Sequence, residues 1–172
     1  MAFIRKNNRV GGLDEAGRGP VLGPMVLTLY VISESKMNAL TGLGIKDSKE
    51  LSPKAREELY LDLMEIADKV AIAEISAKEI NEIMKVGVKL TKLEAAISAC
   101  LINLLKPDIV FIDAASTNAW KYCRSIKSLV NYDVKLVCEH KADRKYPVVS
   151  AASIISKVRR DQVMKELSEI YG

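Results

Sequence analysis

Two adjacent acidic residues, Asp14 and Glu15, stand between an apolar stretch and a turn-like segment that contains Gly17, Arg18 and Gly19. The pattern predicts a buried strand that ends in acid, a tight glycine turn and a second, antiparallel strand within residues 21–32. Neighbouring side chains of a strand point to opposite faces, so the two carboxylates can share a target only where the strand ends. Paired carboxylates beside a basic glycine turn indicate a metal-dependent site that acts on phosphate, although a solvated turn has a similar composition.

Two further acids follow predicted strands: Asp113 ends the apolar run 108–113, and Asp143 comes soon after the alternating stretch 133–139. Ligands of open α/β sheets bind outside the carboxyl ends of the strands, so all four acids are expected to meet there. Four gathered carboxylates repel one another unless a cation neutralises them, and oxygen-only ligands favour Mg²⁺ or Mn²⁺. Two such ions about 4 Å apart can hold both the attacking and the leaving oxygen of a phosphoryl displacement. Taken singly, each aspartate is more simply a turn former.

The glycine turn offers a second kind of chemistry. Gly17, Arg18 and Gly19 can bring backbone N–H groups and a guanidinium to one phosphate or sugar, and a tight turn that needs glycine is compatible with that role. The segment is not a P-loop, because no Gly-Lys-Ser/Thr follows and a strand rather than a helix comes next.

A basic segment precedes the helix that Ser52 and Pro53 are expected to start. It contains Lys46, Ser48 and Lys49, and an anion binds well at a helix start, although a solvated basic loop is equally compatible with the spacing.

Several other polar residues are interpreted as structural. His140 is the only histidine and lies near Asp143 in the sequence, but we assign it to the surface or to packing rather than to catalysis. Ser150, Ser153 and Ser156 recur every three residues, which suits close helix packing, and none has the histidine partner of a serine nucleophile.

The elements that must position these residues alternate along the second half of the chain. We expect helices over residues 53–68, 77–85, 90–105, 118–130 and 147–171, strands over 69–76, 108–113 and 133–139, and a loop or helical turn over 33–40. Alternating strands and helices imply parallel pairing, whereas the opening hairpin is antiparallel, so the predicted architecture is α/β with a mixed sheet.

Composition limits the class of protein. A chain of 172 residues with 49% hydrophobic residues suits one globular domain, and a net charge of +4 permits a polyanionic partner. The three cysteines, at 100, 123 and 138, form no CxxC pair, so we expect reduced thiols in a cytoplasmic protein. No signal peptide or membrane-spanning run is evident, and we expect a monomer with no membrane partner.

Four segments together resemble the type 2 ribonucleases H, specifically the archaeal branch of ribonuclease HII. They are DEAGRGPVLGP (14–24), KDSKELSP (46–53), PDIVFIDAAS (107–116) and HKADRKYPVVSAASIISKVRRD (140–161). The resemblance covers most of the chain, and its first and last motifs are highly specific. It implies an RNase H-like fold, with a mixed five-stranded sheet flanked by helices.

The resemblance also implies a function. A member of this family is an endonuclease that cuts the RNA strand of RNA–DNA hybrids, and cuts 5′ of ribonucleotides embedded in duplex DNA, leaving 5′-phosphate and 3′-hydroxyl ends. It would serve DNA repair and replication, and use two Mg²⁺ or Mn²⁺ ions. The family's catalytic metal ligands correspond to Asp14, Glu15, Asp113 and Asp143. The turn of Gly17, Arg18 and Gly19 would recognise the ribose 2′-hydroxyl, and Lys46, Ser48 and Lys49 would lie near the substrate backbone.

One departure from the family pattern concerns the end of the sequence. Relatives continue into a GSGYPSD-like segment and another helical region, whereas residues 1–172 would form a single catalytic domain that lacks most of this extension. The alternative function is therefore a weak or inactive module that binds RNA–DNA hybrids. A nuclease of the same fold that cuts DNA junctions is a further alternative, which the order of the motifs argues against.

Overall fold

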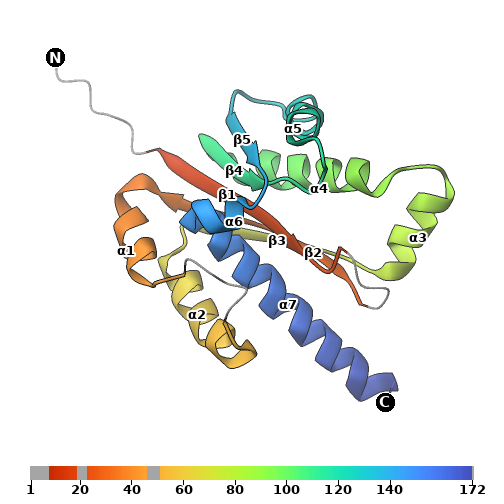
Figure 1. Cartoon of the computed structure of the whole chain (residues 1–172), viewed down its shortest axis with the longest axis horizontal. Coiled ribbons are helices and arrows are strands. Elements are labelled where there is room, and N and C mark those ends of the chain that lie inside the picture. The colour runs from red at the N-terminus through yellow and green to blue at the C-terminus, as the bar shows by residue number, and fades with distance from the viewer. Residues whose placement is uncertain (1–7, 19–22, 46–50, 172) are drawn as a thin grey trace.

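A five-stranded mixed sheet runs through the centre of the computed structural model, which describes residues 8–18, 23–45 and 51–171 (Figure 1). The strand order is β3-β2-β1-β4-β5, with β1 antiparallel to β2, β2 antiparallel to β3, and β1, β4 and β5 parallel. The strands are β1 (Arg9–Ala16), β2 (Met25–Ser33), β3 (Lys69–Ile75), β4 (Ile109–Asp113) and β5 (Lys135–Glu139). This confirms the expected α/β fold, with its opening hairpin and parallel second half.

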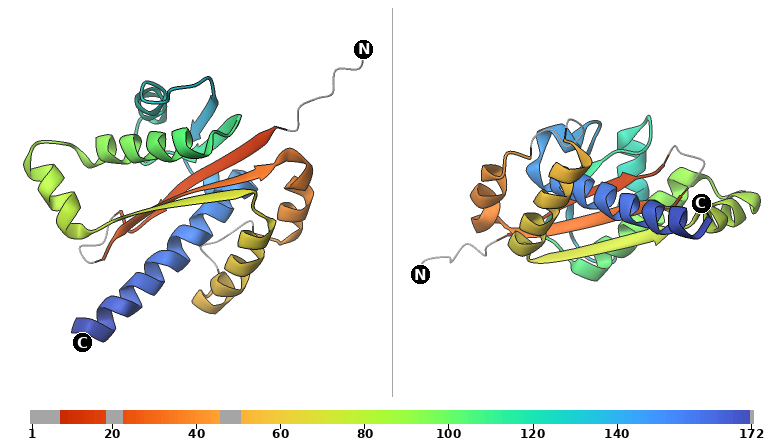
Figure 2. Two further views of the ribbon diagram at one scale, coloured as in Figure 1. Left: turned by 180° about the vertical axis from the view of Figure 1, so that it is seen from behind. Right: turned by 90° about the horizontal axis from the view of Figure 1, so that it is seen from below.

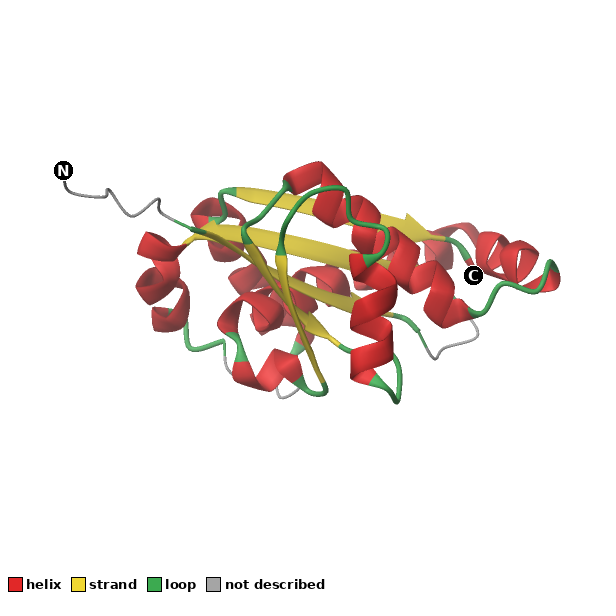
Figure 3. Ribbon diagram, turned by 90° about the horizontal axis from the view of Figure 1, so that it is seen from above, coloured by secondary structure: helices red, strands yellow, loops and turns green. Residues whose placement is uncertain are grey.

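Helices cover both faces of the sheet (Figures 1, 2 and 3). The longer ones are α2 (Pro53–Ile66), α3 (Ala77–Lys85), α4 (Leu90–Leu105), α5 (Ala119–Lys127) and α7 (Pro147–Tyr171), and the shorter ones are the 3-10 turn η1 (Glu34–Lys36), α1 (Met37–Gly42) and α6 (Ala142–Lys145). One hydrophobic core lies between the sheet and α4 and α5, and the other lies between the sheet and α7, with α1 and α2 beside it. Among the helices that the structure describes, none is long and apolar enough to cross a bilayer.

Local sequence signals explain most of the boundaries. Ser52 caps α2 by accepting a hydrogen bond from the Ala55 amide at 3.2 Å, and Pro53 takes the first helical position, as predicted. Ser76 and Glu79 form a reciprocal capping box at the start of α3. The predicted helices over 77–85, 90–105 and 147–171 are confirmed, whereas the four-residue α6 was not predicted.

The cysteines differ from the expectation. Cys123 of α5 and Cys138 of β5 form a disulfide, with their Cα atoms 5.7 Å apart, while Cys100 is free and exposed. The prediction of three reduced thiols is therefore wrong for this pair. Because α5 packs beside β5, a separation of 15 residues in sequence becomes direct contact in space, and these cysteines no longer indicate a reducing compartment.

The central strand and the longest helix approach each other at backbone distance. A Cβ atom added to Gly12 of β1 would lie 2.1 Å from the carbonyl carbon and oxygen of Val148 in α7. No side chain larger than hydrogen fits there, and the contact involves backbone, which cannot turn aside as a side chain can. Gly12 therefore sets how closely α7 lies to the sheet.

We expect Gly12→Ala to destabilise the fold by roughly 3 kcal/mol or more, because the methyl group must displace the backbone of α7. Gly42→Ala is the matched control, since no described atom lies within 4 Å of its added Cβ and alanine is the better helix former. Urea unfolding of both variants measures the difference. Equal stabilities would contradict the close approach of β1 and α7.

Candidate metal and nucleic-acid site

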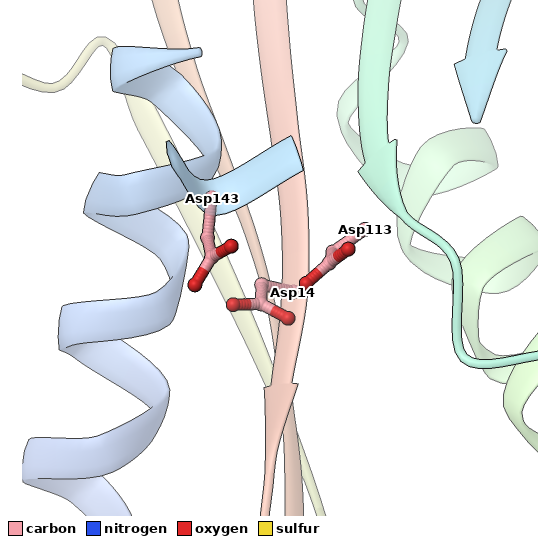
Figure 4. Close-up of side chains that lie close together, drawn as sticks. All are labelled: Asp14, Asp113 and Asp143. Atoms are coloured by element: carbon pink, nitrogen blue, oxygen red, sulfur yellow. The ribbon is translucent and has the colours of Figure 1, made fainter. Parts of the chain in front are cut away.

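Three aspartates from separate elements meet at one edge of the sheet (Figure 4). Asp14 lies near the end of β1, Asp113 ends β4, and Asp143 lies in the first turn of α6. Carboxylate oxygens of all three lie within 4.8 Å of one another. Asp14 and Asp143 are buried and Asp113 is half-buried. The parallel pairing of β1 with β4 brings Asp14 and Asp113 together, because both strands end at this edge.

Hydrogen bonds orient two of these carboxylates. The Ala142 amide donates to Oδ1 of Asp113 at 3.2 Å, which ties the start of α6 to the end of β4. The Glu15 amide donates to Oδ1 of Asp14 at 2.8 Å, and Ser153 of α7 forms a side-chain hydrogen bond with the same carboxylate. The cluster is thus held by backbone and by neighbouring helices as well as by the strands that carry it.

The electrostatics of this cluster favour a cation. The pKa of Asp14 is raised to about 7, chiefly by burial; the charges of Asp113 and Asp143 contribute to the rise, and the hydrogen bond with Ser153 opposes it. An oxygen-only set of donors suits a hard divalent ion such as Mg²⁺ or Mn²⁺ better than zinc. The residues present therefore fit a divalent cation, whose charge would relieve the repulsion among the three aspartates.

Glu15 lies on the other face of β1. Side chains alternate along the strand, so Gly12 and Asp14 face α7, whereas Leu13 and Glu15 face the side of α4. Burial raises the pKa of Glu15 well above its usual range, with further contributions from the carboxylates of Asp14, Glu94 and Asp113. Glu15 is electrostatically close to the aspartates but is not one of the three acids whose oxygens lie within 4.8 Å of one another.

An ion pair connects the glycine turn to α4. Nε of Arg18 donates to Oε1 of Glu94 at 2.7 Å, and the Glu94 side chain is only 1% exposed. The other carboxylate oxygen, Oε2, is buried and has no hydrogen-bond partner among the described residues. Burial raises the pKa of Glu94, and Arg18 counteracts the rise. Glu94 was not predicted as a site residue, because an acidic side chain in a mostly apolar helix usually faces the solvent.

Gly17 lies against α7. Gly17 has a φ of +85°, and a Cβ there would lie 2.4 Å from Nε of Arg160. That Nε donates to the Pro24 carbonyl at 3.2 Å, so Arg160 fills the space that glycine leaves. Gly17 therefore needs to be glycine both for its backbone angle and for this contact.

The serines of α7 do more than permit close packing. Ser153 lies between Asp14 and Lys157, whose ammonium donates to the Ser153 hydroxyl at 2.9 Å. The Ser156 hydroxyl donates to the Asp14 carbonyl at 3.2 Å and forms a hydrogen bond with the Thr28 hydroxyl at 2.8 Å. The spacing of three residues was the available signal, but local sequence does not reveal which neighbour each hydroxyl meets.

The remaining predicted residues fall in two groups. Gly19, Lys46, Ser48 and Lys49 lie outside the described residues. His140 is described and exposed.

Comparison with known proteins gives one consistent family. The ribonuclease HII family model matches residues 11–172. Ribonuclease HII of Thermococcus sibiricus is 45% identical over 166 residues, which cover 95% of this chain and 73% of that protein. The crystal structure of the ribonuclease H2 from Pyrococcus horikoshii OT3 superposes with a TM-score of 0.89 at 40% identity, covering 95% of this chain and 77% of that chain. Bst-RNase HIII in complex with Mn²⁺ superposes with a TM-score of 0.79 at 26% identity, covering 95% and 55%.

The raised pKa of Asp14 yields a prediction about stability without metal. Below about pH 4 the Asp14 carboxyl is protonated in both the folded and the unfolded state. As the pH rises from there, the unfolded state loses this proton first, so the free energy of unfolding falls until the folded state also loses it at about pH 7. In EDTA at pH 8, Asp14→Asn should therefore be more stable than the parent by roughly 1–3 kcal/mol, and the difference should narrow toward pH 5.

The control is Asp62→Asn, which removes an exposed carboxylate of α2 and should leave the pH dependence unchanged. Mg²⁺ should raise the unfolding temperature of the parent and of the control far more than that of Asp14→Asn. Urea unfolding at pH 5 and pH 8, followed by thermal unfolding with Mg²⁺, supplies both readings. A parent that is more stable than Asp14→Asn in EDTA at pH 8 would contradict the assigned repulsion.

Proposed function

The chain belongs to the ribonuclease HII family and is a ribonuclease H enzyme, and we propose that it cuts the RNA strand of RNA–DNA hybrids and cuts 5′ of ribonucleotides embedded in duplex DNA. Hydrolysis adds water across the bond between phosphorus and the 3′-oxygen. The leaving oxygen takes up a proton, so one end carries a 5′-phosphate and the other a 3′-hydroxyl.

One observation carries this proposal: carboxylate oxygens of Asp14, Asp113 and Asp143 lie within 4.8 Å of one another at one edge of the sheet. In the proposed site these aspartates hold divalent ions, and Glu15 completes the set from the opposite face at the strand end. When bound, two Mg²⁺ or Mn²⁺ ions would supply the positive charge that stabilises the attacking and leaving oxygens. The Mn²⁺ complex of Bst-RNase HIII supports the choice of ion.

The glycine turn supplies recognition in this proposal. Gly17, Arg18 and Gly19 present the turn to the ribose, whose 2′-hydroxyl separates RNA from DNA. Glu94 holds the Arg18 guanidinium through Nε, which leaves the two terminal nitrogens available for substrate oxygens. Lys46, Ser48 and Lys49 are proposed to contact the nucleic-acid backbone.

The wider setting follows from the proposed substrate. An enzyme that removes ribonucleotides from duplex DNA serves DNA repair and replication, and works in the compartment that holds the chromosome. We propose that the enzyme is cytoplasmic. We also propose that it acts as a monomer, since all the residues assigned to the site lie on one chain.

The decisive assay uses three labelled substrates with Mg²⁺ or Mn²⁺: a duplex with one embedded ribonucleotide, an RNA–DNA hybrid and an all-DNA duplex. We expect cuts in the first two only, with 5′-phosphate products. Asp143→Asn should lower the rate at least a thousandfold, because it removes charge from the buried cluster, whereas Asp62→Asn should cut like the parent. Binding of the hybrid without a cut by the folded parent would overturn the proposal, as would equal cutting of the all-DNA duplex.

Glu94 should act through Arg18 alone. Glu94→Gln is expected to raise KM roughly three- to tenfold, and Arg18→Ala roughly tenfold or more, because the guanidinium loses its orientation or is absent. The double variant should lose little beyond Arg18→Ala, since the two residues form one unit. Steady-state kinetics test this, with Glu58→Gln on α2 as the exposed control. Additive losses, or a loss of Mg²⁺-induced stabilisation in Glu94→Gln, would contradict the positioning role.

A further inference from the structure

A basic hollow lies between the start of α4, the loop after β4 and α5. Its volume is about 290 Å³. Three lysines and four residues that carry a hydroxyl group line it: Lys89, Lys92 and Lys121, with Thr91, Ser116, Tyr122 and Ser125. Lys89 and Lys92 lie at the start of α4 and Lys121 lies in α5, so the fold, and not a local run of charge, brings the three lysines to one hollow.

The charge in this hollow is uncompensated. Within residues 8–18, 23–45 and 51–171, no carboxylate forms an ion pair with Lys89, Lys92 or Lys121, although the structure pairs other exposed lysines. Lys36 lies 2.5 Å from Asp68, and Lys127 lies 3.3 Å from Asp133. Three like charges that converge without an acid favour an anionic ligand, and the hydroxyls beside them can donate to its oxygens.

Two lining residues relate the hollow to the candidate active site. Ser116 follows Asp113 by three residues, a span of at most about 11 Å along the chain. Tyr122, another lining residue, is buried, and the charges of Glu15 and Glu94 act on its hydroxyl. An extended polyanion with a phosphate at the aspartates therefore has further phosphates within reach of the lysines, since neighbouring nucleotides rise by about 3.4 Å along a strand.

We propose, on the basis of the function proposed above, that this hollow binds a backbone phosphate of the duplex a few nucleotides from the cut. Lysine ammonium groups contact phosphate as point charges and carry no base preference. The site positions the duplex over the aspartates, and it acts on affinity equally for every base sequence.

Single charge removals test the hollow. Lys92→Gln and Lys121→Gln should each raise Kd for an RNA–DNA hybrid, measured by fluorescence anisotropy in EDTA, and KM in Mg²⁺, by roughly three- to tenfold. The slope of log affinity against log salt should become shallower by about 0.7–0.9 for each phosphate that the variant no longer neutralises. Lys69→Gln is the matched control, because Lys69 is an exposed lysine at the opposite end of the sheet.

A substrate scan locates the phosphate. Neutral methylphosphonate groups are placed one at a time along both strands, and Kd is measured for the parent and for Lys92→Gln. At a single position away from the cut, the methylphosphonate should raise Kd of the parent by the same factor as Lys92→Gln does with the unmodified hybrid. At that position it should not raise Kd of Lys92→Gln any further. Inorganic phosphate should compete with the hybrid at a lower concentration for the parent than for Lys92→Gln.

The two proposals fail in different ways. The phosphate site alone would be overturned if the parent cuts the hybrid while Lys92→Gln and Lys121→Gln have the same Kd, KM and salt slope as Lys69→Gln. Additive effects of Lys92→Gln and every methylphosphonate would do the same. A folded parent that cuts neither ribonucleotide substrate would overturn the proposed function, whatever the lysine variants bind.

Discussion

Repulsion among buried carboxylates is the constraint around which this fold is arranged. Asp14, Asp113 and Asp143 are brought within 4.8 Å of one another although burial and mutual charge both oppose their ionisation. Two hydrophobic cores, one on each face of the sheet, provide the stability against which this cost is set. The amide of Ala142 and the hydroxyl of Ser153 then fix the orientation of the acids. The result is a preorganised cluster of acids whose donor atoms fit a divalent ion.

Much of the fold could be predicted, because its elements carry strong local signals. Ser52 and Pro53 mark the start of α2, and the continuous apolar run before Asp113 marks β4. The short α6 escaped prediction because it begins after Lys141, a residue in the left-handed region, and is too short to show helical periodicity. The disulfide between Cys123 and Cys138 escaped for another reason, since no spacing rule links cysteines on a helix and a neighbouring strand.

The residues of the candidate site also fall into those that could be predicted from the sequence and those that could not. The aspartates could be predicted because each follows a strand, and topology brings the ends of parallel strands together. The residues that orient them could not. Glu94 meets Arg18 across the gap between α4 and the glycine turn, and Ser153 meets Asp14 across the gap between α7 and β1. Such pairs depend on how helices lie on the sheet, and single-sequence patterns carry no information about that placement.

The backbone contact between Gly12 and Val148 also decides where the molecule can adapt. Packed helices slide past one another when side chains interdigitate and can change rotamer, but here there is no side chain to rearrange. The aspartate, the serines and Arg160 that flank this contact are therefore placed by the backbones of β1 and α7, with no intervening side chain whose change of rotamer could alter their spacing. On the opposite face, α3 has no buried residue among those described, so fewer packing contacts oppose its displacement.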